Sequence, residues 1–145
     1  MRSFSELHEI IEKELADLYY PSTPKNLYDP IKYVLNIGGK RIRPILMLLS
    51  HQLFSEDIEK SLKAALGIEV FHNFTLLHDD IMDDDDTRRG LNAVHIEYGL
   101  PTAINAGDAM LAIACCNRKT RWSPCSATPK TLASNRIFCH IEPKS

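Results

Sequence analysis

Apolar residues recur every three to four positions at the start of the chain, and this spacing restricts the fold more than any other feature. The apolar positions of this first segment are Phe4, Leu7, Ile11, Leu15 and Leu18. Their period is that of an amphipathic helix. Ser3 and Glu6 stand three residues apart, as the two partners of a capping box do. The pattern predicts a helix over residues 3–20.

Proline and glycine divide the following sequence into further helical segments. A second helix is expected to start near Pro30, because a proline suits the first turn of a helix, and to end at Gly38 and Gly39. Later helices are expected at residues 45–54 after Pro44, from a cap at Ser55 to about Met82, and at 102–114. The polar residues 83–92 are predicted to be a loop. Neither strand alternation nor an internal repeat precedes residue 115, so the predicted fold class is all-α.

Composition is that of a single folded domain. The chain has 145 residues, of which 44% are hydrophobic and 25% charged, with a net charge of −2. This charge favours neither a nucleic-acid binder nor a basic membrane arm. No run approaches the roughly 20 apolar residues of a transmembrane helix, and the expected location is cytoplasmic.

The chain changes character after residue 114. All four cysteines lie in the last 31 positions, and residues 117–145 carry six basic residues and one acidic residue, against 11 and 18 in residues 1–116. The cysteine-free residues 1–114 are typical of a reduced, intracellular protein. For residues 115–145, three origins stay open: a shifted reading frame, a genuine alternative terminus, and a small zinc site. The zinc site has no C-x-x-C spacing to support it.

An acidic cluster closes the fourth expected helix. Asp79 and Asp83 are four residues apart in LHDDIMD, so their carboxylates lie about one turn apart on one side of the helix, with Asp80 beside them. Mg²⁺ binds in proteins through one or two carboxylates together with substrate phosphates. The alternative is a solvated helix end, but negative charge there opposes the helix dipole.

Basic residues stand at two places near this cluster. Arg88 and Arg89 follow it directly, and arginine suits phosphate oxygens. Lys40, Arg41 and Arg43 lie between a glycine pair and a helix-opening proline, which is a candidate anion site. A surface loop with ordinary charges is the alternative reading of the second group.

Three motifs in one order make the chain resemble a known family. GGKRIRP, EVFHNFTLLHDDIMD and RRG together resemble the trans-type prenyl diphosphate synthases, which include farnesyl and geranylgeranyl diphosphate synthases. AINAGDAM at residues 103–110 is similar to the next helix of these proteins. The resemblance covers residues from about 25 to 114 and implies the N-terminal half of the isoprenoid synthase helical bundle, with residues 115–145 as a tail outside the family.

The resemblance also implies roles for individual residues. Asp79 and Asp83, supported by Asp80, would hold Mg²⁺ ions that bind an allylic diphosphate, and Arg88 would contact the same diphosphate. The residues implied for the diphosphate of isopentenyl diphosphate are Lys40, Arg43, His72 and Arg89, with Arg41 a weaker candidate. His72 lies two turns before Asp79 on the same helical face, although a lone histidine is more often structural. Phe74 stands where the family limits product length, which favours a short-chain product, unless it merely packs in the core.

Two departures from the family pattern qualify these expectations. Many members read RRG-x-Pro-Thr-x-His, where this chain continues Leu91-Asn92-Ala93-Val94-His95. In addition, members are roughly twice as long and carry a second aspartate-rich motif, which this sequence lacks. We therefore expect the isolated chain to be marginally stable and unable to complete catalysis alone.

Competing functions remain for a chain of this kind. The first is a Mg²⁺-dependent prenyltransferase that condenses an allylic diphosphate with isopentenyl diphosphate, as a homodimer by family analogy. The second is a non-catalytic diphosphate-binding or regulatory subunit that pairs with a full-length synthase. A terpene cyclase or a head-to-head condensing enzyme is a third class, but GGKRIRP argues against a cyclase, which has no second diphosphate to hold.

Overall fold

The computed structural model describes residues 2–18, 20–21 and 23–116. Its elements are α1 (Phe4–Ala16), α2 (Lys25–Asn36), α3 (Ile42–Gln52), α4 (Glu59–Met82), β1 (Thr87–Arg88), β2 (Leu91–Asn92), α5 (Val94–Tyr98) and α6 (Leu100–Cys116). The predicted all-α class is confirmed, with one short antiparallel hairpin added. Only Cys115 and Cys116 of the expected tail lie within the described residues, as the last residues of α6.

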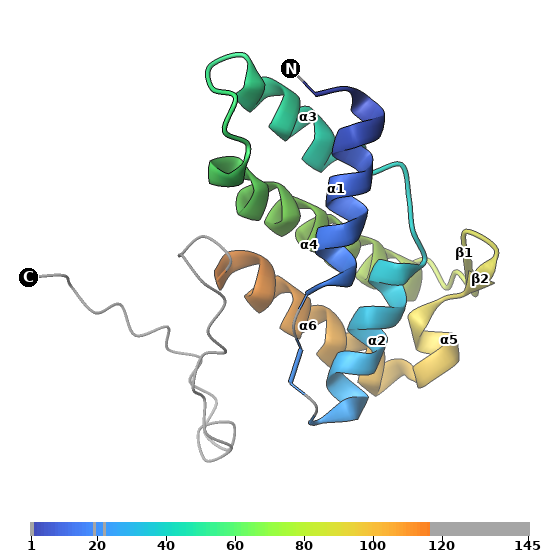
Figure 1. Ribbon diagram of the computed structural model, residues 1–145. Coiled ribbons are helices and arrows are strands. Elements are labelled where there is room, and N and C mark those ends of the chain that lie inside the picture. Colours follow the sequence, from blue (N-terminus) through green and yellow to red (C-terminus); the bar gives the residue numbers. More distant parts are fainter. Residues whose placement is uncertain (1, 19, 22, 117–145) are drawn as a thin grey trace, which may run out of the picture.

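The helices form two layers around α4, the longest of them at 24 residues. Helices α3 and α6 lie on either side of α4, while α1 and α2 lie across this layer (Figure 1). The core between the layers contains apolar side chains from five helices, among them Leu7, Ile31, Leu48, Val70 and Met110. Helix α4 contacts α1, α2, α3, α5 and α6, so residues on its different faces lie against different helices.

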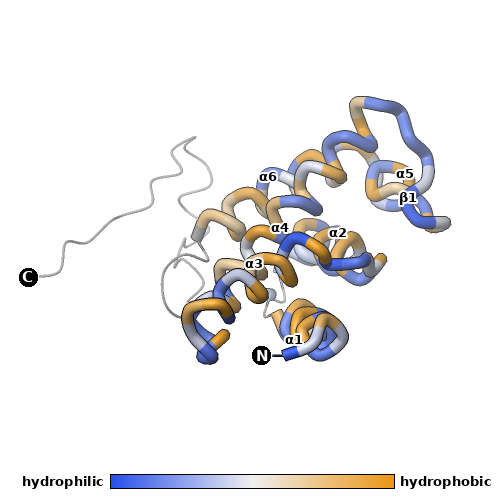
Figure 2. The backbone as a smooth tube through the Cα atoms, turned by 90° about the horizontal axis from the view of Figure 1, so that it is seen from above, coloured by the Kyte–Doolittle hydropathy of each residue, from blue (hydrophilic) through white to orange (hydrophobic). Residues whose placement is uncertain are grey.

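Helix α1 begins as the sequence predicts. The Ser3 backbone N–H donates to Glu6 Oε2 (2.7 Å), and the Glu6 N–H donates to Ser3 Oγ (3.3 Å), which completes the capping box. The apolar stripe Leu7, Ile11 and Leu15 is buried, and Figure 2 shows hydrophilic residues alternating with it along the helix. The helix ends at Ala16, four residues before the predicted limit.

Several predicted helix starts were wrong. Helix α2 begins at Lys25, so Pro30 lies inside it, where the buried proline and its apolar neighbours pack in the core. Helix α3 begins at Ile42, which places Pro44 in its first turn, where a missing N–H breaks no helical hydrogen bond. Helix α4 begins at Glu59 because the Ser55 hydroxyl instead accepts from the Asp57 N–H in a local turn (3.3 Å).

The polar segment after α4 is not entirely a loop. Residues 83–86 form a hydrophilic stretch, seen in Figure 2, and lead into the hairpin β1–β2. The short helix α5 follows and was not predicted. Gly99, with φ of 83°, then separates α5 from α6. No helix in the described part of the chain is long and apolar enough to cross a membrane.

Candidate functional site

The GGKRIRP segment joins α2 to α3, and its last three residues form the first turn of α3. Gly38 adopts a left-handed φ of 82° directly after α2, a conformation that glycine reaches without steric cost. Arg41 is also left-handed, with φ 47° and ψ 32°, and precedes the first residue of α3. Lys40 and Arg43 are exposed on either side of it. Lys40 and Arg43 are thus two exposed cations, and the buried Arg41 lies between them in the sequence.

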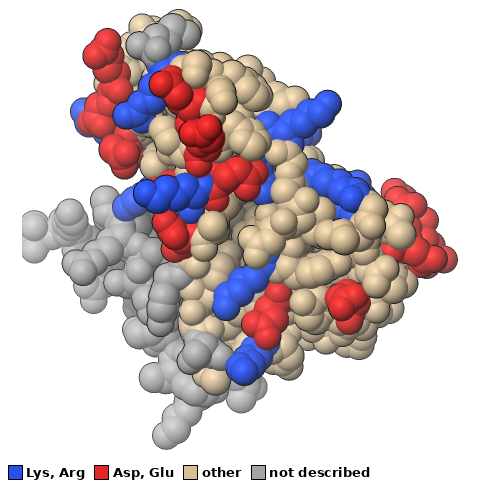
Figure 3. Space-filling view, turned by 45° about the vertical axis from the view of Figure 1, so that its right-hand side comes forward, with Lys and Arg blue, Asp and Glu red and all other residues tan. Residues whose placement is uncertain are grey.

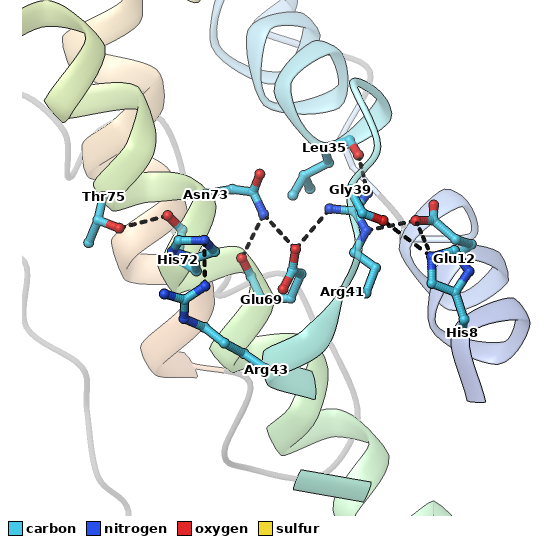
Figure 4. A network of polar contacts seen from close by, with 10 residues as sticks. All are labelled: His8, Glu12, Leu35, Gly39, Arg41, Arg43, Glu69, His72, Asn73 and Thr75. Carbon is cyan, nitrogen blue, oxygen red and sulfur yellow. Dashed lines mark hydrogen bonds and ion pairs between the residues drawn. The ribbon is translucent and has the colours of Figure 1, made fainter. Parts of the chain in front are cut away.

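The buried Arg41 joins three helices. Its Nε donates to Glu12 of α1 (2.7 Å), and its Nη1 donates to Glu69 of α4 (2.8 Å). Its Nη2 donates to the Leu35 carbonyl near the end of α2 (2.7 Å), as Figure 4 shows. Burial alone would lower the pKa of Arg41, but its hydrogen bonds to the two glutamates outweigh burial and raise that pKa.

The RRG motif forms the turn of the hairpin. Arg88 pairs with Leu91 across the two strands, so Arg89 and Gly90 are the two turn residues, with φ of 53° and 82°. Two successive positive φ values are the mark of a type I′ turn. This turn carries Arg89 back to the GGKRIRP segment. A Cβ atom at Gly39 would lie only 2.6 Å from Arg89 Nη1, so glycine leaves room for the guanidinium there.

His72 projects from α4 toward the same place. Arg43 Nη1 lies 2.8 Å from His72 Nε2, so the arginine donates and the imidazole nitrogen accepts. Burial, followed by the positive charge of Arg43, lowers the pKa of His72 from 6.5. Burial also lowers the pKa of Arg89, followed by the charge of Arg41. The positive charge of neighbouring arginines thus acts on both His72 and Arg89.

These side chains line one pocket of about 450 Å³. Its lining consists of Gly39, Lys40, Arg41, Ile42, Arg43, Glu69, His72 and Arg89. The pocket lies in the volume range of small-molecule sites, roughly 300–1,000 Å³. It thus contains all five residues that the sequence analysis assigned to the isopentenyl diphosphate site. They come from three separate parts of the chain: the GGKRIRP segment, α4 and the hairpin.

The aspartate cluster is divided by the structure. Asp79 and Asp83 are exposed at the last turn of α4, where the Asp83 N–H donates to the Asp79 carbonyl (2.8 Å). Asp80 is buried and pairs with Arg88, whose Nε and Nη2 both donate to its carboxylate. Asp80 and Arg88 therefore fasten the hairpin to α4, while the other two carboxylates remain open to solvent.

The two open carboxylates, Asp79 and Asp83, are of the ligand type that magnesium prefers. No group of three or more His, Cys, Asp or Glu side chains that could hold a metal occurs in residues 2–18, 20–21 or 23–116. Asp79 and Asp83 provide two carboxylates one turn apart, and Mg²⁺ commonly uses one or two carboxylates plus phosphate and water oxygens. The donor set fits Mg²⁺ when a phosphate ligand supplies the remaining oxygens.

Helix α4 also carries an aromatic row on another part of its surface. The Phe74 ring lies 5.6 Å from Phe71 and 4.8 Å from His78, measured between ring centroids. Phe74 is partly buried against the core. His78 turns toward α6, where its Nε2 would be 2.7 Å from a Cβ at Gly107. His78 therefore packs between helices, away from His72.

The buried polar network behind the pocket was not predicted from the sequence. Asn73 Nδ2 donates to the Glu69 carbonyl (2.8 Å) and to Glu69 Oε1 (3.1 Å), which supports the carboxylate that holds Arg41. Glu12 and His8 of α1 complete the network. One signal was present, because Glu69 and Asn73 lie among buried positions of α4 that are mostly apolar, and a buried carboxylate requires a partner.

Charged side chains elsewhere on the surface are of both signs. Figure 3 shows basic side chains spread over the face in view, with acidic ones between them and much of the area formed by neither.

The hairpin β1–β2 is held against α2 by a hydrogen bond, because the Tyr33 hydroxyl donates to the Asn92 carbonyl (2.9 Å).

Known proteins are similar in sequence to a large part of this chain. A geranylgeranyl pyrophosphate synthase of Geoglobus acetivorans is 45% identical over 106 residues, 73% of this chain and 33% of that protein. A short chain isoprenyl diphosphate synthase of Methanocaldococcus jannaschii is 49% identical over 72% of this chain and 31% of that protein. The chain thus spans about a third of the length of these relatives.

Solved structures of such proteins are also similar to this chain in fold. The crystal structure of a geranylgeranyl pyrophosphate synthetase from Pyrococcus horikoshii matches with a TM-score of 0.74 and 34% identity, covering 83% of this chain and 38% of that one. A geranylgeranyl pyrophosphate synthetase structure from Geoglobus acetivorans matches with a TM-score of 0.75 and 42% identity, over 79% of this chain and 37% of the other. Residues 24–128 match the polyprenyl synthetase family itself. The chain belongs to the polyprenyl synthetase family.

Proposed function

We propose that this chain provides the diphosphate-binding part of a prenyltransferase that joins an allylic diphosphate to isopentenyl diphosphate. The observation that carries the proposal is the pocket of about 450 Å³, in which Lys40, Arg43, His72 and Arg89 surround one space. Clustered cations are unfavourable unless an anion neutralises them, and lysine and arginine are suited to phosphate oxygens. The pocket therefore selects a ligand with a compact, multiply charged head.

Asp79 and Asp83 belong to the second substrate in this proposal. They would hold Mg²⁺, which supplies positive charge to the departing diphosphate of the allylic substrate. Arg88, whose guanidinium donates to the neighbouring Asp80, would contact the same diphosphate. The two diphosphates then occupy neighbouring sites, one against carboxylates with metal and one against basic side chains.

The reaction proposed for these two sites is a chain elongation. The C–O bond between the allylic carbon and its diphosphate breaks, and the diphosphate leaves with the bonding electrons. The double bond of isopentenyl diphosphate forms a new C–C bond to that carbon, and loss of one proton restores a double bond. The product is five carbons longer. The family also suggests a short-chain product, a homodimer and a cytoplasmic location, and these belong to the proposal.

Binding of isopentenyl diphosphate tests the proposal directly. Calorimetric titration of the 145-residue chain is expected to show binding that Lys40→Ala or Arg43→Ala weakens by about tenfold or more, the effect of losing one charge-assisted hydrogen bond. Lys25→Ala is the matched control, because this exposed lysine on α2 is remote from the pocket lining. Unchanged affinity in both pocket variants would contradict the proposed site.

A diphosphate-binding subunit without catalysis of its own is the second candidate. The observation that favours it is the donor set, since Asp79 and Asp83 are a pair of carboxylates and the described residues contain no group of three metal-binding side chains. Product formation from dimethylallyl and isopentenyl diphosphates with Mg²⁺ separates the two candidates. Turnover by this chain supports the enzyme, whereas turnover that changes only after a full-length synthase is added supports the subunit.

A further inference from the structure

Helix α1 lies outside the residues that match the family, yet it contacts the segment that lines the pocket. The match begins at residue 24, whereas Glu12 accepts a hydrogen bond from Arg41 and His8 Nε2 donates to the Gly39 carbonyl (3.2 Å). Figure 4 shows these contacts extending from α1 across the GGKRIRP turn to α4. Helix α1 is therefore connected to the pocket without lining it.

We propose that Arg41 is a positioning residue and not a diphosphate ligand, and that Glu12 of α1 and Glu69 of α4 hold it so that Lys40 and Arg43 face the pocket. This inference rests on the proposed function, because it concerns the geometry of the same diphosphate site.

The guanidinium of Arg41 already hydrogen-bonds to other groups of the protein through all three of its nitrogens. Each of its three nitrogens donates to a different partner, and those partners belong to three different helices. The Arg41 side chain is 0% exposed, compared with 38% for Glu12 and 4% for Glu69. A phosphate could reach this guanidinium only by breaking buried charged contacts, which is strongly unfavourable.

The backbone of Arg41 provides a second, independent argument. Its φ of 47° and ψ of 32° lie in the left-handed region, where the Cβ atom of a residue other than glycine comes too close to the following carbonyl oxygen. This conformation turns the chain from the glycine pair into α3. It therefore sets the positions of Lys40 and Arg43 relative to each other. An unfavourable conformation at this point persists because the surrounding contacts determine it.

Electrostatics and positioning make opposite predictions for Glu12. Removing a carboxylate near a cationic pocket should strengthen the binding of an anion if charge alone matters, and it would also free Arg41 to act as a ligand. Removing it should weaken binding if Glu12 serves to hold Arg41 and the turn. The sign of the change in affinity therefore distinguishes a ligand from a positioning residue.

The experiment measures inorganic pyrophosphate and isopentenyl diphosphate binding to the full chain by calorimetry. Glu12→Ala is expected to weaken the binding of both by about fivefold to tenfold, as expected for loss of one charged hydrogen bond. The matched control is Glu9→Ala, which removes the same charge from an exposed position of the same helix and should leave affinity unchanged. Equal or tighter binding by Glu12→Ala would overturn the inference.

Three further variants keep the test decisive. Arg41→Lys retains the charge but not the three directed contacts, so it should bind as weakly as Arg41→Gln, whereas a ligand role predicts substantial rescue by lysine. If Glu12→Ala is unfolded by circular dichroism, His8→Ala replaces it, because His8 is partly exposed and its contact is to the Gly39 carbonyl. Undiminished binding by His8→Ala would then count against the inference.

The outcome also separates this inference from the proposed function. If the unmodified chain binds neither pyrophosphate nor isopentenyl diphosphate, the proposed function fails and the inference fails with it. If binding is lost in Lys40→Ala but Glu12→Ala and Arg41→Lys bind like the unmodified chain, the proposed function stands and the positioning role alone is rejected.

Discussion

At the scale of single residues, the pocket brings Lys40, Arg43 and Arg89 close to His72, an imidazole whose pKa is lowered by burial and then by the charge of Arg43. Its Nε2 accepts a hydrogen bond from Arg43, which requires that nitrogen to be unprotonated. A bound diphosphate would favour the protonated imidazole instead. The protonation of His72 therefore reports on the occupancy of the pocket.

We expect the pKa of His72 to lie below 6.5 in the ligand-free chain, because burial and then Arg43 disfavour its charged form. Proton NMR of the imidazole C2–H against pH measures it. Arg43→Ala should raise this pKa more than Arg89→Ala does, since the charge of Arg43 acts on it more strongly. A pKa at or above 6.5, or one that ignores Arg43→Ala, would contradict the geometry described for this pair.

The sign of the accompanying stability change follows from linkage. A pKa that is lower in the folded chain means that the unfolded chain binds the proton first as pH falls below 6.5. The contribution of His72 to the free energy of unfolding therefore decreases with falling pH in that window, and it is fully present above it.

The sequence could predict which residue types form the site, but not which of them are already partnered. Lys40, Arg43, His72 and Arg89 line one pocket, and their binding roles stay predictions. The ion pairs of Arg41 with Glu12 and Glu69 could not be predicted, because they join residues 28 or more positions apart in the sequence. Such pairings depend on helix docking, which local sequence does not specify.

At the scale of elements, the packing of α4 against α6 depends on a small residue at their contact. A Cβ at Gly107 would lie 2.7 Å from His78 Nε2 and 2.8 Å from its Cε1. The His78 ring is also held by Phe74 on its other side. The two helices can therefore approach this closely only because position 107 lacks a side chain.

Gly107→Ala is expected to lower the free energy of unfolding by about 1–3 kcal/mol, the usual effect of overpacking, although alanine favours a helix more than glycine does. Urea denaturation measures the change. Asn105→Ala, at an exposed position of the same helix, should be neutral or slightly stabilising. Adding His78→Ala to Gly107→Ala should recover part of the loss; no recovery would show that the clash lies elsewhere.

Element types were predictable, whereas element boundaries were less so. The end of α4 at Met82 was predicted correctly because a polar run follows it directly. The starts of α2 and α3 were predicted too late, since each proline was taken to mark the first helical residue. Helix α5 was missed because its five residues are too short to show a period.

At the scale of the whole molecule, the outer side of α3 and the turn after it expose large apolar side chains. Phe54 is 91% exposed and Leu53 70%, whereas Leu48 on the inner side of α3 is 0% exposed. Exposed apolar patches promote association between molecules without contributing to the core. The marginal stability expected from the sequence stays a prediction.

We expect Phe54→Ser to change the free energy of unfolding by less than about 0.5 kcal/mol, as is usual for surface positions, and to reduce self-association. Leu48→Ser, at a buried position of α3, should instead destabilise the chain by about 2–5 kcal/mol. Denaturant titration and sedimentation at two protein concentrations measure both effects. A large loss of stability in Phe54→Ser would show that this side chain is covered in solution.

The contacts that assemble the pocket connect residues far apart in the sequence. Arg43 and His72 are separated by 29 positions, Gly39 and His8 by 31, and Asn92 and Tyr33 by 59. Closing such long loops is entropically unfavourable until helices have docked on one another. The pocket should therefore form late in folding, so that weakening its contacts accelerates unfolding while leaving the folding rate nearly unchanged.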